Sequence, residues 1–213
     1  MARKSVWQDD YWLLLMQIYL HRPVGVKPLY NREMVNLSLE LHITPEALQE
    51  RMRQIAELQT PRIERIWNTY SKSPSKLSRA VSLLRKMKGF GAAGQFFDGV
   101  EVQETFERDF RPLEEDSRFI PAMLIMVLNL YFQLTPSTMV TDTPEVGELA
   151  RLLKLKRSDI VMLLQLYQYC DPYLNRRETI FSPLLLPCQQ VWQRFANNDQ
   201  LPLLAKELTA YFK

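Results

Sequence analysis

Apolar residues recur along most of the chain at spacings of three and four, the period of an amphipathic helix. In residues 45–58, Leu48, Met52, Ile55 and Leu58 fall on one stripe. Few stretches show the alternation of apolar and polar residues that is typical of a strand. The clearest one, residues 99–103, continues into a segment that suits a helix equally well. The spacing predicts an all-α protein with helices near residues 8–21, 31–42, 45–58, 61–70, 74–88, 120–134, 144–154, 158–169, 187–196 and 201–212.

Many of the expected helices begin at a hydroxyl residue followed by proline. The side-chain oxygen can accept a hydrogen bond from a first-turn N–H, and proline at the first position lacks only an N–H that is unpaired there anyway. We therefore expect side-chain caps at these starts. The five dipeptides are Thr44-Pro45, Thr60-Pro61, Ser73-Pro74, Thr143-Pro144 and Ser182-Pro183.

The chain also contains an internal similarity. Residues 13–55 align with residues 125–167 without a gap, at an offset of 112, and a later stretch brings Trp67 onto Trp192 at an offset of 125. Identical residues are few, so the alignment depends on the turn, the tryptophan and the helix starts recurring in the same order. This order predicts an internal duplication, with two related helical halves.

Each half contains a segment with the spacing of a helix, a tight turn and a second helix. The residues expected to pack or turn are Leu37, Ser38, Leu41, His42–Thr44, Leu48 and Met52 in the first, and Leu149, Ala150, Leu153, Leu155 and Ile160 in the second. Residues 37–58 and 149–169 thus resemble the general helix-turn-helix superfamily pattern. The resemblance implies nucleic-acid binding. The chain departs from this pattern at the turn, where His42 and Lys154 replace the usual glycine, the residue that adopts a positive φ most easily.

The first of these segments favours DNA contact more than the second. Gln49, Arg53 and Gln54 lie opposite the buried stripe of its second helix, and both residue types are suitable donors to base edges in a major groove. Arg51 is expected at a phosphate. Three glutamates on the same helix oppose this interpretation. The second helix of the later segment, residues 158–169, is apolar nearly all round, so we expect it to be buried.

A further basic element covers residues 72–88, which contain no acidic residue. Leu77, Val81 and Leu84 form its apolar stripe, and its cations can neutralise phosphates. The alternative is an ordinary solvated helix face. The expected phosphate contacts are Lys72, Lys76, Arg79, Arg85, Lys86 and Lys88.

Charge is unevenly distributed along the chain, which has a net charge of +3. Residues 1–90 carry +7, residues 91–117 carry −6 and residues 118–213 carry +2. Four phenylalanines in the acidic stretch need burial, so it is not expected to be a free linker. We expect a basic half (1–90), an acidic aromatic connector (91–118) that packs on one or both halves or masks the basic part, and a second half (119–213) that is structural or associative.

Composition narrows the class of protein. A hydrophobic content of 46% with six glycines indicates a folded chain. Cys170 and Cys188 do not form a disulfide framework, so a reducing, cytoplasmic location is expected. Residues 119–134 are strongly apolar but shorter than the ~20 residues that span a bilayer, which predicts a buried helix instead. Asp9 and Asp10 interrupt the N-terminal apolar stretch, and no signal peptide is expected.

No catalytic, metal or cofactor site emerges from the sequence. Residues 89–94 match G-x-G-x-x-G, but a basic helix precedes them where a dinucleotide site needs a strand. His21 and His42 are the only histidines, and no cysteine stands at zinc-ligand spacing from them. Cys170, among tyrosines, is expected in the core.

The sequence therefore predicts a non-enzymatic DNA-binding protein that uses the first helix-turn-helix-like segment and the basic element. Regulation is one role that such a protein can have. The alternative is a helical protein-interaction or scaffold protein in which the helix-turn-helix spacing is only architectural. The second half is expected either to stabilise the fold or to form a homodimer or a contact with a protein partner, with the apolar turn at residues 184–186 as one contact.

Overall fold

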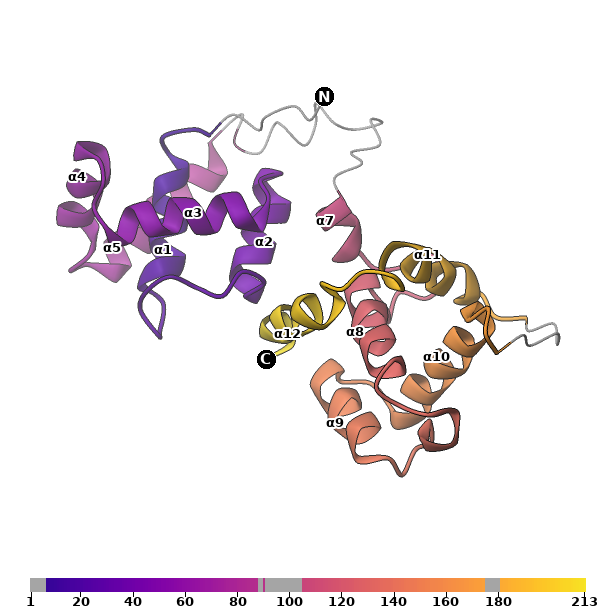
Figure 1. The fold of residues 1–213 in the computed structure, drawn as a ribbon. Helices are drawn as coiled ribbons and strands as arrows, with labels where there is room; N and C mark the ends of the chain where they lie inside the picture. Colours follow the sequence, from indigo (N-terminus) through magenta and orange to yellow (C-terminus); the bar gives the residue numbers. More distant parts are fainter. Residues whose placement is uncertain (1–6, 88–89, 91–104, 175–180) are drawn as a thin grey trace. The chain divides into compact units, whose positions relative to one another are not determined.

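The computed structural model describes residues 7–87, 90, 105–174 and 181–213. Over these residues the chain forms eleven α-helices and one short 3₁₀ helix, and no strand. The predicted all-α fold is confirmed. The chain divides into two compact units, Met1–Glu107 and Arg108–Lys213 (Figure 1).

The first unit is built around a central helix, α1, which contacts each of the other four. Tyr11, Trp12 and Leu14–Met16 of α1 are all buried, because a helix covered on several sides must be apolar on several faces. Leu48 and Met52 of α3 complete the centre of this core. The helices are α1 (Tyr11–Leu20), α2 (Arg32–Leu41), α3 (Pro45–Ala56), α4 (Pro61–Tyr70) and α5 (Pro74–Lys86).

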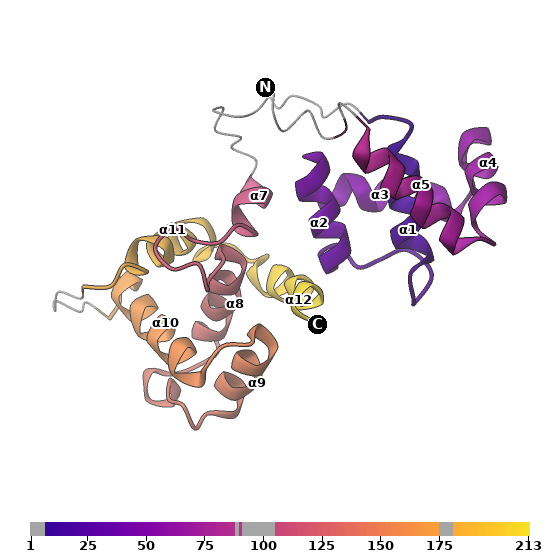
Figure 2. The same ribbon diagram turned by 180° about the vertical axis from the view of Figure 1, so that it is seen from behind.

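The second unit repeats this plan around α8, which contacts α9, α10, α11 and α12 (Figures 1 and 2). The apolar stretch 119–134 is this central helix, buried as predicted. Among the described residues, no helix combines the length and apolar character needed to cross a bilayer. The elements are α7 (Thr105–Asp109), which spans the unit boundary, α8 (Pro121–Tyr131), the 3₁₀ helix η1 (Pro136–Thr138), α9 (Pro144–Leu153), α10 (Arg157–Cys170), α11 (Leu185–Phe195) and α12 (Leu201–Phe212).

The turns that follow α2 and α9 have the same geometry. His42 has φ 54° and ψ 38°, and Lys154 has φ 58° and ψ 37°. After each turn residue, the next amide donates to a carbonyl five residues back, at 3.2 Å for Ile43 and 2.9 Å for Leu155, which closes the helix in a left-handed cap. His42 and Lys154 thus both adopt the left-handed conformation that is easiest for glycine. Whether the two units share an origin stays a prediction.

The predicted side-chain caps form at two of the five starts. Thr44 and Thr60 accept from the amide three residues on, at 3.4 and 3.3 Å. Ser73 forms no such bond, and Thr143 donates its hydroxyl to an upstream carbonyl instead. Ser182 is not a cap, because α11 begins three residues later. Proline nevertheless stands in the first turn of α3, α4, α5 and α9, as predicted.

The described part of the predicted connector, residues 105–118, is packed. Arg194 of α11 donates two hydrogen bonds to Asp109, at 2.7 and 2.8 Å. Phe110 is buried with its ring centroid 4.9 Å from that of Tyr211. The boundary between the units falls inside the predicted connector. Its residues 91–104, and most of the G-x-G-x-x-G match, lie outside the described residues.

Candidate functional site

The solvent side of α3 is where the sequence predicts base contacts. Gln49 donates from Nε2 to the carbonyl of Lys27 at 3.0 Å. Arg53 donates to Oε1 of Gln49 at 3.3 Å and to Oε2 of Glu50 at 3.2 Å. Gln54 is half-buried on the same helix. Contact with a base therefore requires Gln49 and Arg53 to exchange existing bonds.

The charge exposed on α3 is acidic. Glu46, Glu50 and Glu57 are all exposed beside the single exposed cation, Arg53. An exposed pair such as Glu50–Arg53 contributes only about 0.2–1 kcal/mol, so it leaves the repulsion between these carboxylates and a phosphate backbone in place. The helix that the sequence favours for reading DNA is poorly suited to approach it.

Arg51, predicted to contact phosphate, lies against two tryptophans. Its guanidinium carbon is 4.9 Å from the ring centroid of Trp7 and 5.7 Å from that of Trp12. The side chain is half-buried. This cation–π arrangement holds Arg51 at the edge of the core. It disfavours the phosphate contact that the sequence predicts for Arg51.

A buried lysine that the sequence analysis missed supports α3 from the side. Lys27 is 5% exposed, and its Nζ donates to the carbonyls of His21, at 2.8 Å, and of Pro23. Its backbone bonds to Met52 and Gln49 hold the α1–α2 loop on α3. Burial lowers the pKa of the Lys27 ammonium, and the charge of Glu33 opposes that shift.

Helix α5 carries the predicted basic surface. Leu77, Val81 and Leu84 are buried against the core, while Lys76, Arg79 and Lys86 are exposed. At 100° per residue these three cations fall within an arc of about 80° and span about 15 Å along the axis. Lys72 is exposed just before the helix. Among the described residues, none of these four forms an ion pair, although Lys76 Nζ lies 5.5 Å from the ring centroid of Tyr70.

Arg85 differs from the other cations of α5. It donates to both carboxylate oxygens of Glu40 in α2, at 2.7 and 2.8 Å. These hydrogen bonds raise the pKa of Arg85 above its usual value, against the opposing effect of burial. The charge of Arg85 is thus already matched inside the unit. Lys88, the last predicted contact, lies outside the described residues.

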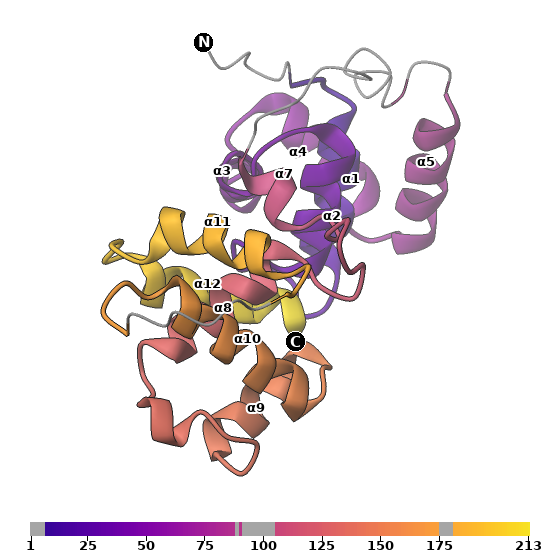
Figure 3. The ribbon, with the colours of Figure 1, turned by 90° about the vertical axis from the view of Figure 1, so that its right-hand side faces the viewer.

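The two predicted DNA-contacting helices, α3 and α5, do not form one surface. Helices α3 and α5 both pack on α1, and they lie on opposite sides of it: α3 is in front of α1 in Figure 1, α5 is in front in Figure 2, and Figure 3 shows them on either side. The predicted base contacts on α3 and the predicted phosphate contacts on α5 therefore do not lie on one face of the unit.

Within the described part of the second unit, no helix carries a row of exposed cations like that of α5. Helix α10 is buried through Ile160, Leu163, Leu164 and Tyr167, as predicted. Arg157, at its start, donates to a backbone carbonyl of the preceding loop at 2.9 Å. This unit therefore supports a structural or associative role better than a nucleic-acid contact.

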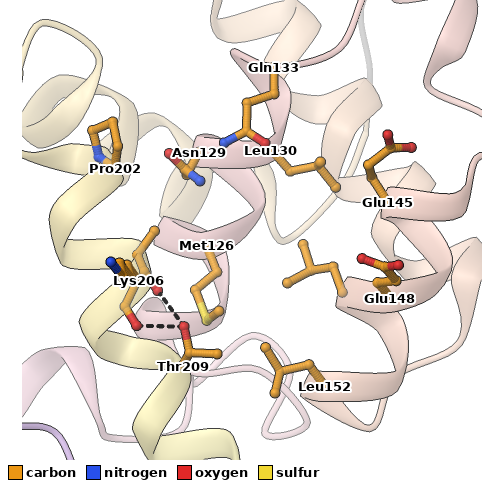
Figure 4. A pocket seen from close by; sticks show the side chains of 12 residues that line it. Met126, Asn129, Leu130, Gln133, Glu145, Glu148, Leu152, Pro202, Lys206 and Thr209 are labelled. Atoms are coloured by element: carbon orange, nitrogen blue, oxygen red, sulfur yellow. Dashed lines mark hydrogen bonds between the residues drawn. The ribbon is translucent and has the colours of Figure 1, made fainter. Parts of the chain in front are cut away.

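What the second unit does carry is an open groove of about 430 Å³ between α9 and α12 (Figure 4). Met126 and Leu130 of α8 form its apolar floor together with Ala205 of α12. Leu149 and Leu152 of α9 line one wall. No sequence pattern indicates this groove, because α12 lies far along the chain from α8 and α9.

In the described residues, no three His, Cys, Asp or Glu side chains cluster as a metal site needs. Burial raises the pKa of Cys170 to about 11 and that of Cys188 further, so neither is a ready nucleophile. His21 lies 2.6 Å from Glu33, and His42 lies 2.8 Å from Glu107. These histidines are engaged in pairs and not in a ligand set.

Comparison with protein-family models, with curated proteins and with solved structures finds no significant match for this chain.

Proposed function

We propose that this protein is a non-enzymatic nucleic-acid-binding protein that holds the phosphate backbone of DNA with the exposed face of α5. The observation that carries this proposal is the row formed by Lys76, Arg79 and Lys86, with Lys72 beside it. No acidic residue interrupts residues 72–88. Such a face neutralises phosphates and releases counterions, which supplies most of the free energy of sequence-independent binding.

The proposal assigns α3 a structural role. Its glutamates are exposed, Arg51 is stacked on tryptophan, and Gln49 is bonded to the α1–α2 loop. Because phosphate contacts do not identify a base sequence, we expect little sequence preference. The proposed function thus keeps the predicted phosphate contacts and omits the base contacts that the sequence predicts on α3.

The test is fluorescence-anisotropy titration of a labelled random duplex at about 50 and 200 mM salt. We expect micromolar affinity at low salt and a steep loss at the higher concentration. The double variant Lys76→Glu/Arg79→Glu should abolish measurable binding. Both side chains are exposed, so the fold should persist.

The matched control is Arg151→Glu/Lys213→Glu, which makes the same change in net charge on exposed residues of the second unit. It should leave the affinity within about twofold of the wild type. Absence of binding at low salt, or an equal loss in the control, would refute the proposal and favour the protein-interaction alternative.

A further inference from the structure

The groove of the second unit combines an apolar floor with an acidic wall. Glu145 and Glu148 stand one turn apart on α9, both exposed, on the opposite side of the groove from Lys206 of α12 (Figure 4). Within the described residues neither glutamate forms an ion pair or a side-chain hydrogen bond. The acidic wall is therefore available to a cation from outside the unit.

The floor offers both apolar contact and hydrogen bonding. Met126 and Leu130 lie in the groove beside Asn129 of α8 and Gln133, which lies in the turn after that helix (Figure 4). No side-chain hydrogen bond within the described residues engages either carboxamide. These groups can orient an occupant at the end of the groove nearest Gln133.

The shape of the groove indicates the form of its occupant. A trough between two helices, floored by a third, matches the way in which an amphipathic helix docks its apolar stripe. Its volume of about 430 Å³ accommodates roughly two or three aliphatic side chains, the number that one helix face presents over two turns. Two carboxylates along one wall select basic residues on the occupant and disfavour acidic ones.

The corresponding place in the first unit carries an ion pair between two helices. At the offset of 112, Leu152 corresponds to Glu40, and Glu148 corresponds to Asn36. Glu40 reaches Arg85 of α5 through two hydrogen bonds and so joins α2 to α5. In the second unit this position is leucine and lines the groove. Glu145 has an acidic counterpart in Glu33, so the difference between the units lies in Glu148 and Leu152, which stand where the first unit has Asn36 and Glu40.

We infer that the groove formed by α8, α9 and α12 binds an amphipathic helix of a partner protein, with the basic residues of that helix facing Glu145 and Glu148. The inference is independent of the proposed DNA contact, because every residue that it uses lies in the second unit.

The probe is a fluorescein-labelled peptide of 14 residues, with leucines at spacings of three and four and lysines elsewhere, titrated with the full-length protein at about 100 mM salt. A second peptide carries glutamates in place of the lysines. We expect saturable binding of the lysine peptide, at least about tenfold tighter than that of the glutamate peptide. Glu145→Lys/Glu148→Lys should reverse the preference.

Two further variants separate the groove from general electrostatics. Glu114→Lys/Glu115→Lys makes the same charge change on exposed residues elsewhere in the second unit and should keep the preference. Leu152→Ala should weaken binding of both peptides severalfold by reducing the apolar wall. Circular dichroism melting checks that each variant is folded.

The inference is overturned if the Glu114/Glu115 control loses the preference equally, or if Leu152→Ala binds as tightly as the wild type. It is also overturned if the protein self-associates and Glu145→Lys/Glu148→Lys dissociates it, since the occupant is then a second copy of this chain.

Discussion

Replacing Glu40 with glutamine should strengthen DNA binding, although Glu40 itself lies in α2 and not on the proposed interface. Its carboxylate holds the guanidinium of Arg85 at 2.7 and 2.8 Å. Glutamine removes that charge while keeping the shape of the side chain. Arg85 is then released next to Lys86, where its long side chain can reach the same row of phosphates.

The magnitude follows from the number of unmatched cations. Lys72, Lys76, Arg79 and Lys86 give four phosphate contacts, and each contributes about 0.9 to the slope of log K against log salt. The wild-type slope should be about −3.6, which corresponds to a loss of about 150-fold between 50 and 200 mM salt. Release of Arg85 should steepen the slope to about −4.5.

The assay is anisotropy titration of one duplex at five salt concentrations. Lys76→Gln should reduce the steepness by about 0.9, whereas Arg85→Gln should leave the slope unchanged, because its charge is already matched. Glu46→Gln is the control for Glu40→Gln. It makes the same change in charge on α3, on the other side of α1, and should not steepen the slope.

Two results would refute this reasoning. One is a slope for Arg85→Gln that falls as much as that for Lys76→Gln, which would mean that Arg85 contacts phosphate despite Glu40. The other is an equal steepening of the slope by Glu46→Gln and by Glu40→Gln, which would mean that the change follows net charge and not the release of Arg85. Loss of the exposed Glu40–Arg85 pair should lower the free energy of unfolding by no more than about 1 kcal/mol, which thermal melting can check.

Three other predictions concern the scaffold. Lys27→Met should lower the free energy of unfolding by about 1–3 kcal/mol in urea, since two backbone carbonyls lose a buried donor; unchanged stability would contradict it. Lys154→Gly should raise the free energy of unfolding by about 0.5–1 kcal/mol, because the φ of Lys154 is positive. His42→Gly, at a similar φ, should lower the free energy of unfolding, because it also removes the bond to Glu107, a buried glutamate of α7. A change of the same sign in both variants would contradict a stabilising role for that bond. At pH 8, Cys170 should react with a disulfide reagent about 100-fold more slowly than a thiol of pKa 9, and should speed up towards pH 11, with Cys188 slower still.

The helices could be predicted from the sequence because each has its own local signal. The predicted bounds agree with the structure within about three residues for all ten helices, including 61–70 and 201–212, which agree at both ends. An apolar spacing of three or four suffices for this, and in six of these helices a proline at the first or second position adds to the signal. The five-residue α7 has neither signal, and it was not predicted as a helix.

The candidate site was less predictable because it depends on which helices become neighbours. The sequence shows that Arg51 and Arg85 are basic, but not that one stacks on Trp7 and the other pairs with Glu40 45 residues away. It likewise cannot show that α3 and α5 lie on opposite sides of α1. Burial of Lys27 runs against the strong preference of lysine for the surface, so composition and spacing carry no sign of it.

The two units show how a shared arrangement of helices can carry different surfaces. In both, a central apolar helix contacts four others, and a left-handed residue closes the turn between the second and third helices. These features fix the backbone but leave the solvent-facing positions free to differ. At one such position Glu40 joins two helices of the first unit, while its counterpart Leu152 lines a groove in the second. Because the basic face of α5 and the acidic groove of the second unit attract opposite charges, an anionic polymer and a basic helix need not compete for the same surface.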